Sequence, residues 1–247
     1  MKTQLRIAVC IGLLLVFAAA FMRSAPIVGA SATGQIVGTV KLDGAAPHQK
    51  PIDMSKDPAC AQAHGGAPAT AENVVIGANG GLANVVVYIS QGLTGNEAAI
   101  SSQLATMDQK GCVYVPHVVA LNIGQKMTVL NSDKTAHNIH PQPNPTGGNA
   151  QWNKSQIVGA GPIEVAWTNE EVAIPVKCNI HPWMRGYIAV VKGPFGLSND
   201  TGAFKLDNVP PGSYTLTAWQ ETYGTQTAKV TVTAGTPVTT DFTFKAK

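Results

Sequence analysis

The sequence predicts an all-β protein, and three observations carry this prediction. Short runs rich in Val, Ile and Thr recur along the chain, and these residues favour strands. The 247 residues include 25 Gly and 16 Pro, which indicates many turns. Charged residues make up only 13% of the chain, so long helices with a charged face are not expected. The length suits one large domain or two small ones.

The first 32 residues have the pattern of an export signal. Two basic residues precede an uncharged apolar run at 7–21, and Ala30-Ser31-Ala32 offers small residues for cleavage. Cleavage after Ala25 is the second choice. An uncleaved membrane anchor is the alternative, although the apolar run is short for a span. We therefore predict a signal peptide at 1–32, a periplasmic or secreted protein, and no membrane span after cleavage.

The charge balance excludes one large class of partners. Cleavage would remove three of the 17 basic residues and none of the 14 acidic ones, which leaves a formally neutral chain. Its sequence contains no basic cluster. Nucleic acid is therefore not an expected partner.

Strand patterns begin directly after the signal. The range 34–42 is predicted to be a strand that ends at an Asp-Gly turn, and 45–72 is predicted to be a long loop rich in Ala, Pro, His and Gly. Strands at 74–76 and 84–90 flank an Asn-Gly-Gly turn, which is a hairpin signal. A short helix is predicted within 93–107.

After Cys112 the predicted strands follow one another at short intervals, and this spacing is typical of an antiparallel sandwich or barrel. The range 113–121 is predicted to be one strand, with Pro116 marking an edge or a bend. Further strands are predicted at 126–131, 156–158, 163–167, 171–176 and 187–192, with a polar loop after 140. Four more follow Gly193-Pro194, at 203–206, 214–220, 225–233 and 238–244. This last region is small for an independent core, so it should pack on another part of the chain.

The cysteines suggest one disulfide and one metal ligand. Cleavage of the signal leaves Cys60, Cys112 and Cys178, and an odd cysteine in an exported protein calls for an explanation. The economical one pairs Cys60 with Cys112 and keeps Cys178 as a thiolate. The alternative is that Cys60 and Cys112 are free and buried, which an oxidising compartment disfavours.

The stretch 177–186 gathers side chains that bind metals. Cys178, His181 and Met184 follow the spacing Cys-x2-His-x2-Met, and a second imidazole lies upstream at His137 or His140. One Cys, two His and a weak axial Met form the ligand set of a blue-copper site. Zinc is the rival metal, but zinc favours more thiolates or a carboxylate and gives Met no role. Taken singly, each residue has a structural explanation; their order and spacing indicate a metal site.

The run 178–186 resembles the copper loop of the amicyanin type, within the cupredoxin family. The stretch 112–138 is similar to the first-ligand half of plastocyanin-like domains in the same family. The resemblance implies a Greek-key β-sandwich with one copper ion. Carried over by residue, its ligands are His137, Cys178, His181 and Met184. Pro175 and the lack of an aromatic residue before the Cys depart from the family pattern.

Three further residue roles follow from this resemblance. Asn138, next to the first ligand, implies a tether between the two ligand segments. The family's His-Asn pair favours His137 as the first ligand, and His140 is the alternative. Partners of the family dock beside the second His, which assigns that role to Pro182 and Trp183. The alternative for Trp183 is burial against the rest of the chain.

A second resemblance lies outside the copper motif. Residues 202–206 and 209–216, with a Pro-Pro-Gly turn before Tyr214, resemble the carboxypeptidase regulatory-like (transthyretin-like) β-sandwich, as do 36–41 and 83–87. We predict an N-terminal β segment and loop at 33–82, a cupredoxin domain at 83–192 and a regulatory-like module at 194–247. A further hypothesis joins 34–90 and 194–247 into one sandwich, with the cupredoxin part inserted. Whether 83–90 belongs to the cupredoxin part stays open.

These patterns together predict an exported mononuclear type 1 copper protein. It would carry single electrons between redox partners, such as a periplasmic dehydrogenase or cytochrome c, and would not be an enzyme. One alternative is an extracytoplasmic β-sandwich binding or structural protein whose site is vestigial or holds copper. Another is an accessory subunit of a periplasmic dehydrogenase.

Overall fold

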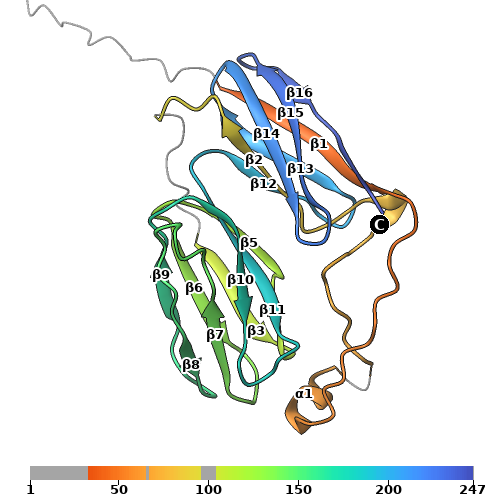
Figure 1. Ribbon diagram of the computed structural model, residues 1–247, viewed down its shortest axis with the longest axis vertical. Coiled ribbons are helices and arrows are strands. Elements are labelled where there is room, and N and C mark those ends of the chain that lie inside the picture. Colours follow the sequence, from red (N-terminus) through yellow and green to blue (C-terminus); the bar gives the residue numbers. More distant parts are fainter. Residues whose placement is uncertain (1–32, 65–66, 96–103, 247) are drawn as a thin grey trace, which may run out of the picture. The chain divides into compact units, whose positions relative to one another are not determined.

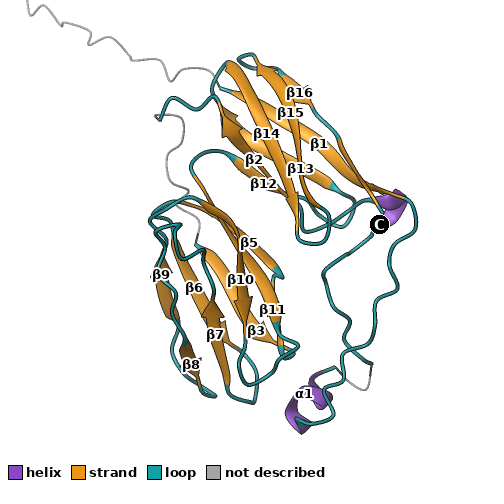
Figure 2. Cartoon of the chain, viewed as in Figure 1, coloured by secondary structure: helices purple, strands orange, loops and turns teal. Residues whose placement is uncertain are grey.

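The structure is a computed structural model that describes residues 33–64, 67–95 and 104–246. Strands dominate these residues, as Figure 2 shows, and the predicted all-β class is confirmed. The predicted signal peptide lies outside the described residues. Within the described ranges, no helix is long and apolar enough to cross a membrane.

One sandwich is built from both ends of the described chain. Its first sheet has the order β13-β1-β16, with β17 also pairing β1, and its second has the order β12-β2-β14-β15. In Figure 1 the early strands β1 (orange) and β2 (olive) lie among the blue C-terminal strands. The bounds are β1 (Gly34–Asp43), β2 (Val86–Gln91), β12 (Phe195–Leu197), β13 (Ala203–Val209), β14 (Gly212–Gln220), β15 (Gly224–Val232), β16 (Pro237–Thr239) and β17 (Phe242–Lys245).

The core of this sandwich draws on distant parts of the sequence. Ile36, Leu82 and Ile89 from the N-terminal part are buried with Leu206 and Leu216 from the C-terminal part. Each fully buried aliphatic side chain contributes about 1.5–3 kcal/mol, so neither part keeps its apolar face covered without the other. The discontinuous sandwich hypothesised from the sequence has this strand pairing.

A second sandwich lies in the chain between β2 and β12. Its sheets have the orders β5-β11-β10-β7-β8 and β4-β3-β6-β9. Buried Met107, Leu121, Ile139 and Ile188 belong to its core, which also includes Cys178. The bounds are β3 (Ala105–Lys110), β4 (Val113–Val115), β5 (Val118–Asn122), β6 (Lys126–Asn131), β7 (His137–Pro141), β8 (Lys154–Gln156), β9 (Ile163–Ala166), β10 (Glu171–Lys177) and β11 (Arg185–Val191).

The sequence left open whether 83–90 belongs to the cupredoxin part, and the pairing of β2 bears on this point. Its ladders run to β12 and β14, through pairs such as Gly196↔Val87 and Ala218↔Val87. It therefore pairs with the discontinuous sandwich, although it lies inside the range 83–192 predicted as the cupredoxin domain. A domain boundary after β2 is consistent with its pairing to β12 and β14. A short run of consecutive apolar residues such as 85–89 can belong to either sandwich, so its pattern alone does not choose the partner strands.

Several predicted elements need correction. The helix predicted within 93–107 is contradicted at 105–107, which begin β3 because Met107 is buried beside β6; residues 96–103 lie outside the described part. The strand at 74–76 is reduced to one bridge, Ile76↔Leu82, beside the short 3-10 helix η1 (Ala78–Gly80). Pro116 splits the predicted strand 113–121 into β4 and β5. The loop 45–72 contains α1 (Pro58–Ala63), which Asp57 caps with its side chain.

Candidate metal centre

Two segments of the second sandwich bring the predicted ligands together. His137 begins β7, while Cys178 directly follows β10, and these two strands pair antiparallel through Lys177↔His140. The turn between β10 and β11 carries His181 and Met184. It is closed by two backbone bonds, from the Cys178 amide to the Met184 carbonyl (3.2 Å) and from the Met184 amide to the His181 carbonyl (3.0 Å). The ladder and the closed turn fix the two ligand segments side by side.

Three donor atoms converge in the interior. Ligand atoms of His137, Cys178 and His181 all lie within 4.8 Å of one another. The two imidazole Nδ1 atoms are 2.9 Å apart, and His181 Nδ1 is 4.0 Å from the Cys178 sulfur. The side chains are 0%, 3% and 3% exposed, and Met184 is fully buried in the same core. This is a nitrogen and sulfur donor set shielded from water.

Asn138 links the two segments, as its position beside His137 led us to expect. Its side-chain oxygen accepts the backbone N–H of Asn179 at 2.7 Å and lies 3.3 Å from the Cys178 sulfur, which donates to it when protonated. Its side-chain nitrogen donates to Asn153 at 2.7 Å. One amide therefore ties the first-ligand strand to the loop that carries the other ligands.

Two members of the cluster have shifted pKa values. Burial acts to raise the pKa of the Cys178 thiol, but hydrogen bonds from His137 and from loop amides outweigh it and lower that pKa to about 7. Burial acts to lower the pKa of His137, but Asp133 and Cys178 outweigh it and raise that pKa to about 9. The metal-free cluster thus holds a thiolate readily, which is the form that binds metals.

Two carboxylates that the sequence reasoning missed orient the imidazoles. Asp133 lies 2.9 Å from Nε2 of His137, and Asp57 lies 2.9 Å from Nε2 of His181. With a proton held on each Nε2, the Nδ1 atoms face the cluster, which is the orientation that a metal needs. The raised pKa of His137 means that a metal must displace the proton from its Nδ1. Asp133 had a detectable signal, because it lies four residues before His137. Asp57 had none, because 124 residues separate it from His181.

A disulfide holds α1 against the same cluster. Cys60 and Cys112 form the predicted bridge, and Cys178 is the free cysteine among those that the structure describes. The Cys60 sulfur is 3.7 Å from Nε2 of His181. The indole N–H of Trp183 donates to the Cys112 carbonyl at 3.0 Å, with its ring 5.0 Å from that of His181. The edge of His181 is therefore covered.

The other predicted residues lie farther from the cluster. His140 is partly exposed, and its nitrogens contact Asn179 (3.0 Å) and Gln151 (2.7 Å) rather than the donor atoms. Pro182 is exposed, while Trp183 is half-buried. The docking role of Pro182 and Trp183 stays a prediction.

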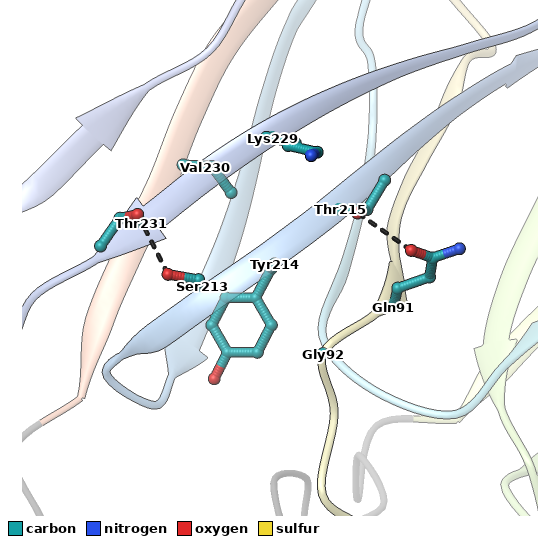
Figure 3. Close-up of a pocket in the computed structure, with 8 residues that line it drawn as sticks. All are labelled: Gln91, Gly92, Ser213, Tyr214, Thr215, Lys229, Val230 and Thr231. Atoms are coloured by element: carbon teal, nitrogen blue, oxygen red, sulfur yellow. Dashed lines mark hydrogen bonds between the residues drawn. The ribbon is translucent and has the colours of Figure 1, made fainter.

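Competing sites in the described residues are weaker. Two further groups of metal-binding residue types include Cys60 or Cys112, whose sulfurs are joined to each other and are not thiolates. A hollow of about 490 Å³ lies on the discontinuous sandwich. Its lining residues come from the end of β2 and from strands β14 and β15 (Figure 3). Two pairs of its side chains already bond each other, Ser213 with Thr231 and Thr215 with Gln91. Lys229 is the single ionisable side chain besides Tyr214 among its lining residues, so this hollow offers no reaction centre.

Comparisons with known proteins return one family model and a set of solved structures. Residues 195–245 match the family model of the carboxypeptidase regulatory-like domain, and this range holds β12 to β17. No curated protein matches the chain significantly. The solved structures that are similar to this chain include cupredoxins and a copper-containing nitrite reductase.

A purple cupredoxin from Nitrosopumilus maritimus is 21% identical, with a TM-score of 0.30, over 35% of this chain and 99% of its own. An amicyanin variant in the Cu(I) state, with one Met replaced by Ala, is 18% identical, with a TM-score of 0.32, over 42% and 98%. The copper-containing nitrite reductase of Thermus scotoductus is 18% identical, with a TM-score of 0.33, over 42% of this chain but only 26% of its own.

Proposed function

We propose that this chain is an exported mononuclear type 1 copper protein that carries single electrons between redox proteins. The observation that carries the proposal is the buried cluster of His137, Cys178 and His181, with donor atoms within 4.8 Å of one another. Two imidazoles and one thiolate are the equatorial ligands of blue-copper sites. Met184, buried in the same turn, would supply the weak axial contact. Zinc fits less well, because no carboxylate or second thiolate points into the group formed by these three residues.

Each residue of the cluster has a defined task. Copper, when bound, supplies one-electron chemistry between Cu(I) and Cu(II). Cys178 holds the thiolate, which its lowered pKa favours. His137 and His181 present Nδ1 because Asp133 and Asp57 hold their Nε2 atoms. Asn138 keeps the sulfur and the loop in register with β7.

The surroundings support carriage of electrons rather than turnover of a substrate. The three donor side chains are at most 3% exposed, so a substrate has no direct access to them. A packed and hydrogen-bonded shell also limits rearrangement when the charge of the site changes. The Cys60–Cys112 disulfide supports export, because such bridges persist in oxidising compartments. Partners such as a periplasmic dehydrogenase or cytochrome c remain part of the proposal.

The deciding experiment is copper loading followed by a visible spectrum. A type 1 site gives an intense thiolate-to-copper charge-transfer band. Cys178→Ser should abolish this band while the far-ultraviolet circular dichroism of the β fold persists. His140→Ala, outside the cluster, should keep the band. A folded, copper-bound protein without the band would reject electron carriage and leave copper holding as its role; a band that survives in Cys178→Ser would show the site to be misassigned.

A further inference from the structure

The edge of His181 is closed to a docking partner. Its Nε2 atom contacts the Asp57 carboxylate at 2.9 Å and the Cys60 sulfur at 3.7 Å, both on the α1 side. Trp183 covers the ring from another direction and is fixed to the Cys112 carbonyl. The imidazole is 3% exposed. Because the disulfide pins α1 in place, a partner cannot reach this imidazole without displacing a covalently tethered segment.

A second part of the ligand loop borders a hollow that includes no residue of α1 among its lining. A hollow of about 510 Å³ is lined by Cys178 itself, together with neighbours that include Asn179 and Pro182. Asn179 and Pro182 are exposed, and Ile180 between them in the chain is 51% exposed. Among the three donor residues, Cys178 lines this hollow, and neither His137 nor His181 does.

The open face carries two cations, and one of them, Arg185, also borders a neighbouring hollow that Glu72 and Glu221 line. Lys177 and Arg185 are directly opposed across the β10–β11 ladder, and both line the hollow. Like charges directly opposite each other destabilise a sheet, so this pair calls for an explanation. The residues lining the hollow include no carboxylate, and neither cation forms a salt bridge within the described residues. A carboxylate-rich surface is the partner that would neutralise both charges.

From these observations we infer that electrons cross at the Cys178–Asn179 face, and that the partner is a one-electron redox protein with a carboxylate-rich docking patch that Lys177 and Arg185 receive. The inference rests on the proposed function. It deepens that function by naming the exit face and the chemistry of the partner's surface.

A hollow on the α1 side is the competing exit. It measures about 900 Å³, and Lys110 and Lys134 line it. None of the copper ligands is among its lining residues; its nearest link to the cluster is Asp133, one hydrogen bond beyond His137. The exposed Lys110 and Lys134 are therefore a matched control for the pair at the open face.

The first test needs no copper. Poly-L-glutamate serves as a carboxylate-rich probe, and its binding to the metal-free full chain is measured by calorimetry at low ionic strength. The double variant Lys177→Gln/Arg185→Gln should bind about tenfold more weakly than the unmodified chain. The double variant Lys110→Gln/Lys134→Gln should bind as the unmodified chain does. Equal losses in both variants, or a loss in neither, would overturn the docking face.

The second test follows the electron. In the copper-loaded chain, hexacyanoferrate(III) takes one electron from Cu(I), which becomes Cu(II), and is itself reduced to hexacyanoferrate(II). Stopped-flow measurement should show a slower reaction in Lys177→Gln/Arg185→Gln than in the unmodified chain. Poly-L-glutamate should slow the reaction of the unmodified chain but not that of this double variant. Slowing confined to Lys110→Gln/Lys134→Gln would place the exit on the α1 side. A loaded chain without the charge-transfer band would instead reject the proposed function, while the calorimetry still decides the docking face.

Discussion

Asn138 bears on the metal centre more than any other residue that is not itself a proposed ligand. It is 3% exposed and joins β7 to the loop through bonds to Asn179 and to the Cys178 sulfur. A buried amide that loses its partners leaves them without hydrogen bonds, and each such loss costs about 1–3 kcal/mol. Asn138 therefore adds a side-chain tether to the ladders and the closed turn that hold the loop.

Asn138→Ala should lower the free energy of unfolding of the metal-free protein by about 2–3 kcal/mol, because the Asn179 amide and Asn153 both lose a bond. Urea unfolding followed by tryptophan fluorescence measures this change. Asn153→Ala removes the outer bond alone and should cost less. If the two variants were equally stable, Asn138 would not tether the loop.

Met184 allows packing and metal tuning to be separated. Met184→Leu keeps a side chain of similar volume, so it should cost less than about 1.5 kcal/mol of stability. Loss of the thioether removes an axial donor that favours Cu(II), so the reduction potential should rise. Met127→Leu is the control, because Met127 is equally buried in the same core but lies on β6. Equal potentials in the two variants, measured by redox titration, would exclude Met184 as a ligand.

At the scale of elements, the segment around α1 acts as a cover held by one covalent bond. α1 has only six residues, and Asp57 caps its N-terminus through the amides of Ala59 and Cys60. A helix this short is marginal by itself. Its place beside His181 therefore depends on the disulfide.

Replacing both Cys60 and Cys112 with Ser should destabilise the protein by up to about 4 kcal/mol, since the bridge closes a loop across 52 residues of sequence separation. The cover should also loosen, so hydrogen exchange of the Cys60 amide position and its neighbours in α1 should accelerate. Mass spectrometry of deuterium uptake measures this effect. Unchanged protection of 58–63 would show that noncovalent contacts, and not the bridge, hold α1.

The elements also show how far sequence patterns reach. The bounds predicted for β6, β10 and β15 agree with the observed bounds within a residue or two, because the apolar pattern of a strand is a local property of the sequence. The ligand loop was recognisable because Cys178, His181 and Met184 lie within seven residues of sequence. The sequence predicts no strand at 137–141, since its five residues HNIHP carry polar and Pro signals that the β10 pairing overrides. Asp57 has no sequence signal, because the disulfide and contacts such as the Thr135 hydroxyl bring it to His181 from a distant part of the chain.

At the scale of the whole molecule, the N-terminal strands complete sheets made by the C-terminal ones. β1 pairs with β13, β16 and β17, and β2 pairs with β12 and β14. The family model covers only 195–245, so it describes an incomplete sandwich.

The C-terminal fragment 194–247 should not fold alone, because β13 and β14 would each lose a neighbouring strand. Thermal unfolding followed by circular dichroism should show no cooperative transition. A chain that joins 33–91 to 194–247 through a short linker should fold, since β2 and β12 are adjacent antiparallel strands. Cooperative unfolding of the fragment alone would contradict this view of the sandwich.

The strand order also has a consequence for synthesis on the ribosome. β1 emerges early, yet every strand that pairs with it in these sheets is made after residue 200. The segment 104–192 can complete its own ladders while β1 and β2 still wait for partners. During that interval the chain exposes the unpaired edges of β1 and β2, which are sites of aggregation. The segment 104–192 can thus be complete before the sandwich into which it is inserted, and the last fifty residues supply the strands that cover those edges.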